Sequence, residues 1–198
     1  GDLAGRRILF WTAYAPLILS SSDIVYRSSV LNTLARTARH LEQMADKMTP
    51  GTARIEAWAG VVAAGLLMPG GEGRRLAGEE GLAIALAEGF TDDGGPICRS
   101  PVRLLQCLSS LAMLQRCYEA RRAVPQSILT ETIARGVEAL LGVTLGDGHL
   151  SSWQGGLPVA KPDVDAVLRA CGVKVQPLLQ AYDWGYQRLA AKDTVIVL

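Results

Sequence analysis

The chain has 198 residues, of which 49% are hydrophobic and 20% are charged. These proportions predict a globular chain with a sizeable core and exclude the composition of a disordered one. The net charge of +1 gives the molecule as a whole no electrostatic attraction to nucleic acid or to an acidic membrane. We therefore expect no nucleic-acid partner.

Six helices are predicted before residue 145, from apolar residues at helical spacing and from turn residues between them. The first covers about 5–18, with Pro16 poorly suited to its end. A long second helix starts after the caps in "SSSD" and stops at "TPG". The others are expected at about 53–68, 74–88, 101–122 and 125–142. Because their connections are short, we expect antiparallel helix pairs.

The helix at 101–122 is predicted to be a wall of the core. Pro101 suits its first turn, and Leu104, Leu108 and Leu111 recur at helical spacing behind it. We expect these three side chains to be almost inaccessible to solvent.

After residue 145 the pattern changes. "LGDGHLSSWQGGLP" reads as a glycine-rich loop, "KPDVDAVLRACG" as a short helix and "YQRLAAKDTVIVL" as two short strands. The expected divisions are a helical domain at 1–145, a glycine-rich linker with a short helix at 146–181, and the start of a β domain at 182–198.

The cysteines and the apolar runs each exclude a class of site or segment. Four cysteines without a CxxC pair, beside two histidines, do not fit a zinc site, so we expect free, mostly buried thiols and no metal or cofactor. The longest uncharged apolar runs, "ILFWTAYAPLIL" and "AWAGVVAAGLLM", have twelve residues each, whereas a membrane span needs about 20.

Residues 51–118 carry a longer pattern. It reads G-x-x-R-I-E-A-x-A-G-V-V-x-A-G-L-x-x-P, then "DGG", then "SP" opening a leucine-rich helix that ends near "YEA". "YRSSVLNTLARTARHL" precedes it, and "GDGHL" with a later "GG" follows it. With these motifs the chain resembles the helical domain of the bacterial heparinase II/III-like proteins.

The resemblance implies a mainly α fold. The chain would form a partial (α/α) toroid, a barrel of antiparallel helix pairs, that ends in the first strands of a β-sandwich domain continuing downstream. It also implies a polysaccharide lyase-like protein that binds an acidic, uronate-containing polysaccharide and cleaves it by β-elimination. The alternative is a non-catalytic helical scaffold that binds a glycan or a protein. A periplasmic location would follow from the family's lyases, with a cytoplasmic one left open.

The residues that carry the family's chemistry differ here. The family usually has Asn-His after the glycine that corresponds to Gly51, and this chain has Thr52 and Ala53. The Tyr-His that follows the Ser-Pro motif falls on Arg103 and Leu104. Elimination needs a base for the C5 proton and donors that neutralise the carboxylate, so the fold inference is stronger than the activity inference.

Several residues remain candidates for a site. His40 and Arg103 are candidate catalytic residues, and the candidate substrate-binding residues are Asp93, Arg99, Arg103, His149 and Trp153. Arginine suits carboxylate or sulfate, and Trp153 beside His149 suits a sugar ring. The alternative is that these are turn, cap and surface residues, with the arginines pairing to Asp92 and Asp93 to hold the loop.

Overall fold

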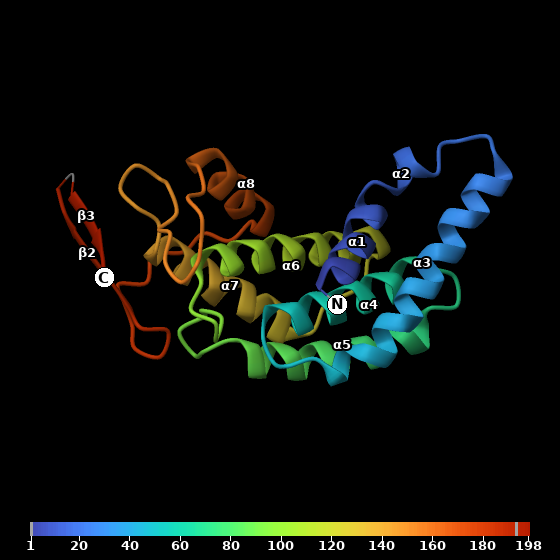
Figure 1. Cartoon of the computed structure of the whole chain (residues 1–198), viewed down its shortest axis with the longest axis horizontal. Coiled ribbons are helices and arrows are strands. Elements are labelled where there is room, and N and C mark those ends of the chain that lie inside the picture. Colours follow the sequence, from blue (N-terminus) through green and yellow to red (C-terminus); the bar gives the residue numbers. More distant parts are fainter. Residues whose placement is uncertain (1, 193) are drawn as a thin grey trace. The chain divides into compact units, whose positions relative to one another are not determined.

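A computed structural model describes residues 2–192 and 194–198 and shows a mostly helical chain that ends in a small antiparallel sheet (Figure 1). This arrangement confirms the predicted fold class of helices followed by strands. The helices are α1 Asp2–Ala13, α2 Ala15–Ile18, α3 Ile24–Met44, the 3-10 helix η1 Ala45–Lys47, α4 Thr52–Leu67, α5 Glu72–Gly89, α6 Pro101–Arg121, α7 Ser127–Gly142 and α8 Lys161–Cys171. The strands are β1 Gln180–Ala181, β2 Tyr186–Ala191 and β3 Thr194–Val197.

The chain divides into two compact units. The first unit contains Gly1–Ala85 and Met113–Gln126, and the second unit contains Leu86–Ala112 and Ser127–Leu198. Each is described by itself below.

Helix α4 is the centre of the first unit. Every residue from Ile55 to Leu66 is buried, and the helix contacts both α1 and α3. Small residues allow this, since a Cβ on Gly60 would lie 2.8 Å from the Cα of Gly5 in α1. The alanine- and glycine-rich sequence of α4 therefore sets how closely α1 can approach.

The expected first helix is broken. Helix α1 ends at Ala13 and a separate single turn, α2, follows. Pro16 explains the break, because it has no N–H to donate and its ring clashes with the carbonyl four residues earlier in a continuous helix.

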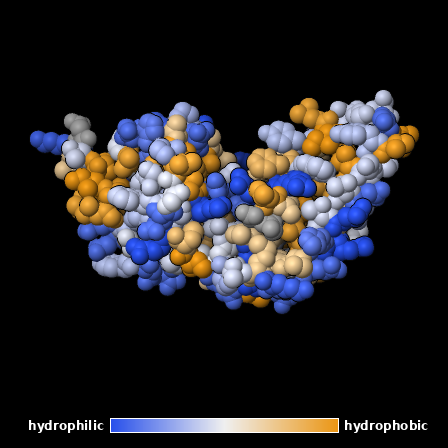
Figure 2. Space-filling model, in the orientation of Figure 1, coloured by the Kyte–Doolittle hydropathy of each residue, from blue (hydrophilic) through white to orange (hydrophobic). Residues whose placement is uncertain are grey.

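Helix α3 begins as predicted but is buried over only part of its length. The Asp23 carboxylate caps it by accepting hydrogen bonds from the N–H groups of Val25 and Tyr26, at 2.8 and 3.1 Å. Its buried residues are Leu34, Ala38 and Leu41, all in the second half. Apolar side chains gather over α2 and the start of α3 on the surface (Figure 2), among them Leu17, Ile24 and Val25.

The second unit is built on the first half of α6 and on α7. Leu104, Leu108 and Leu111 are each 0% exposed, which confirms the predicted core wall. A Cβ on Gly136 of α7 would lie 2.9 Å from a methyl of Leu108. Helix α7 therefore packs directly on α6 at this glycine.

The sheet closes the second unit. Strands β1 and β2 pair Ala181 with Tyr186, and β2 pairs with β3 in the order β1-β2-β3. The N–H of Leu178 donates to the carbonyl oxygen of Glu138, which joins the start of the sheet to α7. The short strands are thus supported by a helix and not only by each other.

Two further expectations concern thiols and membranes. Cys107, Cys117 and Cys171 are buried free thiols and Cys98 is an exposed one, as expected. None of the helices in the described part of the chain is both long and apolar enough to cross a bilayer.

Candidate functional site

The "TDDGG" loop between α5 and α6 is a tight, well-bonded turn in the second unit. The N–H of Gly94 donates to the carbonyl oxygen of Thr91 at 2.9 Å, and Phe90 pairs with Pro96 in an isolated bridge. Gly94 has a φ of +79°, and a Cβ there would lie 2.4 Å from the backbone of Arg135. The loop therefore needs glycine both for its backbone conformation and for its close approach to α7.

Asp93 and Arg99 bind the turn at residues 183–185. One carboxylate oxygen of Asp93 accepts hydrogen bonds from the N–H groups of Asp183 and Trp184, the latter at 3.0 Å. The Arg99 guanidinium donates to the carbonyl oxygens of Trp184, at 2.8 Å, and of Gly185, at 3.2 Å. Neither side chain forms an ion pair with the other, so both hold the loop through backbone groups far along the chain.

The turn that they hold carries two buried aromatic rings. Trp184 is 0% exposed and meets Tyr186 edge to face, with ring centroids 4.7 Å apart. The Tyr186 hydroxyl donates to the carbonyl oxygen of Arg99 at 2.7 Å, and burial raises the pKa of this phenol. The Asp93–Arg99 loop is therefore part of a packed junction with the sheet.

Arg103 and Trp153 remain open to solvent in the second unit. Arg103 lies in the first turn of α6, and among residues 2–192 and 194–198 its guanidinium donates only to the side chain of Gln106, at 3.3 Å. Trp153 is 46% exposed. A Cβ on Gly156 would lie 3.4 Å from Val102, so the turn that follows Trp153 packs against the first turn of α6. The structure thus brings an exposed guanidinium and an exposed aromatic ring onto neighbouring segments.

The two histidines are each exposed. His149 is half exposed, and its Nδ1 lies 3.2 Å from the carboxylate of Asp147. The pKa of Asp147 is lowered, first by the hydrogen bond from the backbone N–H of His149. His40 is an exposed residue of α3 in the first unit. Neither histidine is placed by a buried hydrogen bond, as a catalytic base usually is.

A buried polar network in the first unit has no counterpart among the predicted site residues. Glu79 of α5 is 7% exposed and accepts two hydrogen bonds from Arg75, at 2.7 and 2.9 Å, and one from the hydroxyl of Tyr118, at 2.7 Å. Arg75 also pairs with Glu72. The four-residue spacing of Arg75 and Glu79 was a visible sign of an ion pair, but nothing in the sequence indicated Tyr118.

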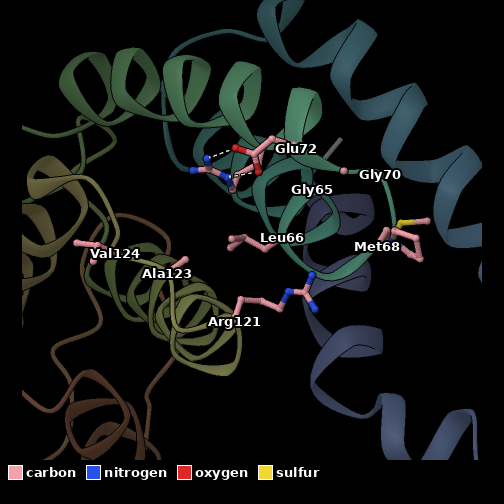
Figure 3. A pocket seen from close by; sticks show the side chains of 11 residues that line it. Gly65, Leu66, Met68, Gly70, Glu72, Arg121, Ala123 and Val124 are labelled. Carbon is pink, nitrogen blue, oxygen red and sulfur yellow. Dashed lines mark hydrogen bonds and ion pairs between the residues drawn. The ribbon is translucent and has the colours of Figure 1, made fainter.

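The same network borders a cavity of about 570 Å³ at the junction of α4 and α5 (Figure 3). The hydrogen bonds that Arg75 donates to Glu72 and then to Glu79 raise the pKa of Arg75, so this guanidinium is already paired. Arg121 extends into view from the end of α6 and has no carboxylate partner among the described residues. The lining side chains include no serine, cysteine or histidine, and the carboxylate of Glu72 in the lining is already paired with Arg75.

The described side chains form no cluster of possible metal ligands. Across residues 2–192 and 194–198, no three histidine, cysteine, aspartate or glutamate residues are grouped so as to hold a metal ion.

Comparisons with known proteins show the fold. No family model matches the chain, and neither does any curated protein. Among solved structures, a crystal structure of heparinase III superposes with a TM-score of 0.61 at 18% identity, over 73% of this chain and 23% of that one. A second heparinase III, the BT4657 gene product with methylated lysines, superposes with a TM-score of 0.65 at 16% identity, over 85% of this chain and 27% of that one.

The chain spans about a quarter of the length of these two neighbours. At such low identity the superpositions speak for the fold alone. The chain therefore has the fold of a heparinase-like helical region followed by a small sheet.

Proposed function

We propose that the chain belongs to a polysaccharide lyase-like protein and binds an acidic, uronate-containing polysaccharide. The observation that supports this most directly is the superposition on two heparinase III structures. The motifs in residues 51–118 point the same way from the sequence. On this proposal the expected β domain continues beyond the strands at the end of the chain.

The proposed contact surface is formed by Arg103 and Trp153. A guanidinium in the first turn of a helix lies beside free N–H groups, and both bind carboxylate or sulfate well. An exposed indole offers a flat face for the C–H groups of a sugar ring. Asp93 and Arg99 stay out of this surface, because their polar atoms already bind the backbone of residues 183–185.

Binding is favoured over cleavage for this chain. Leu104 is fully buried, and neither Thr52 nor Ala53 carries a group that can remove a weakly acidic proton. Arg103 can neutralise a carboxylate, but an arginine side chain stays protonated in proteins and so cannot accept a proton as a general base. The non-catalytic glycan-binding scaffold is therefore the second candidate, and these four positions are what favour it.

The test is the affinity for sulfated and unsulfated uronate oligosaccharides, measured by calorimetry. Arg103→Ala and Trp153→Ala should each lower the affinity about tenfold, or about 1.4 kcal/mol, and Arg103→Ala should weaken its salt dependence. Arg169→Ala, a change at an exposed arginine of α8, is the matched control and should have no effect. Equal affinity in all four proteins would contradict the proposed surface.

A further inference from the structure

A small cleft in the second unit lies between the end of α5, the start of the following loop and α7. Its volume is about 180 Å³. Its apolar wall includes Leu86 and Phe90, and its polar lining includes Asp92, Thr132 and Arg135. Neither Arg103 nor Trp153 lines it, so it is separate from the surface proposed above.

Thr132 is the most informative of the lining residues. It is only 3% exposed, and its hydroxyl forms no hydrogen bond with the described residues, but it is not among the fully buried polar atoms without a partner, so solvent still reaches it. Thr130, two residues earlier in α7, instead donates to the backbone carbonyl of Ser127 at 2.8 Å. The cleft is where a partner for the Thr132 hydroxyl can be supplied.

Two oppositely charged side chains that line the same cleft are also without an ion-pair partner among the described residues. Asp92 and Arg135 are both exposed, and neither forms an ion pair within 4.0 Å among the described residues. Nearby Thr91 differs, because its hydroxyl already donates to the carbonyl oxygen of Gly95 at 3.2 Å. The free polar groups of the cleft are therefore one carboxylate, one guanidinium and one hydroxyl.

We propose that this cleft binds a single carboxylate-bearing sugar unit. Arg135 would bind the carboxylate, Asp92 and Thr132 would bind ring hydroxyls, and Phe90 would contact the C–H face of the ring. The volume is below the roughly 300 Å³ at which drug-sized pockets begin. The cleft can therefore hold one sugar ring but not an oligosaccharide. The assignment rests on the proposed function only for the choice of a uronate over other hydroxylated acids.

The experiment is an NMR titration of the isotope-labelled 198-residue chain with D-glucuronate, D-glucose and L-alanine. Glucuronate should shift the amide signals of residues 90–92 and 128–135, while glucose, which lacks the carboxylate, should bind at least tenfold more weakly. Arg135→Gln should lower the affinity for glucuronate about tenfold. No shifts at tens of millimolar glucuronate, or tighter binding of the zwitterion alanine, would overturn the proposal.

Thr132→Val should change binding without changing folding. Replacing a hydroxyl that has no hydrogen-bond partner in the described protein by a methyl group should leave the melting temperature nearly unchanged, while affinity for glucuronate falls several-fold. A lower melting temperature would mean that the hydroxyl is bonded within the protein, and unchanged affinity would mean that it does not touch the ligand; either contradicts the site.

Two readouts separate this inference from the proposed function. The amide shifts of residues 90–92 and 128–135 report on the cleft, and calorimetry with the oligosaccharides reports on the surface of Arg103 and Trp153. If oligosaccharide binding fails in the wild-type chain but glucuronate still shifts the amides of the cleft, the proposed function is wrong and the cleft stands. If glucuronate shifts amides near Arg103 and none at the cleft, the cleft is not the site.

Discussion

The Arg99 guanidinium donates a hydrogen bond of 2.8 Å to the carbonyl oxygen of Trp184, 85 positions further along the chain. Asp93 accepts from the N–H of the same tryptophan at 3.0 Å. Two loop residues that the sequence offered as ligands for a sugar are therefore engaged with the backbone of one turn. This relationship separates Arg99 from Arg103, although the two are four positions apart.

Arg99→Ala should destabilise the fold by about 1–3 kcal/mol, because it leaves backbone carbonyls of residues 184 and 185 without their charged donor. The free energy of unfolding from urea denaturation measures this. Arg103→Ala, which removes an exposed side chain bonded only to Gln106, should change that free energy by no more than about 0.5 kcal/mol. Equal losses in the two variants would show that Arg99 does not hold the turn.

Leu108→Ala should cost about 2–5 kcal/mol, since the side chain is fully buried and packs against Gly136 of α7. Leu157→Ala is the matched control, because Leu157 is 77% exposed in the same unit. Equilibrium unfolding of both variants is the measurement. A melt of Leu108→Ala that coincides with that of the control would be incompatible with a core position.

Alkaline pH should destabilise the chain through Tyr118. Burial, and then its hydrogen bond to Glu79, raise the pKa of this phenol above its ordinary value of about 10. Above about pH 10 the unfolded chain loses this proton while the folded chain keeps it, so the free energy of unfolding falls as the pH rises.

Tyr118→Phe should remove the part of the alkaline decrease in unfolding free energy that Tyr118 causes. At neutral pH it should lower the free energy of unfolding by about 1 kcal/mol, because the hydrogen bond to Glu79 is lost. Urea denaturation at several pH values between 8 and 11 measures it. Tyr14→Phe, at a tyrosine that is 54% exposed, should leave the pH dependence as in the wild type. If the free energy of unfolding still falls steeply at alkaline pH in Tyr118→Phe, groups other than Tyr118 cause the fall.

The 198-residue chain should release no unsaturated uronate from heparan sulfate, chondroitin or alginate. The reason is that Thr52, Ala53 and the buried Leu104 stand where the family's base and its partners are expected. Ultraviolet absorbance of the unsaturated product is the readout, with a heparinase III as the positive control. Turnover on any of the three polymers would show that another residue supplies the base.

Local chemistry in the sequence determined the secondary structure well. Asp23 caps α3 and Pro101 opens α6, because caps and proline act on backbone groups within a few residues. The leucines of α6 were identifiable as core because helical spacing alone places them on one face. The pattern in residues 51–118 led to the heparinase-like fold that the superpositions show.

Only the tertiary structure decided what the polar residues do. The partners of Asp93 and Arg99 lie 85 to 91 positions away, and no local pattern encodes a hydrogen bond over that separation. Thr132 looked like any helical threonine until packing placed it in the cleft that Asp92 and Arg135 also line. Helical periodicity likewise could not show that the first half of α3 stays exposed, because an apolar face is buried only where another element packs on it.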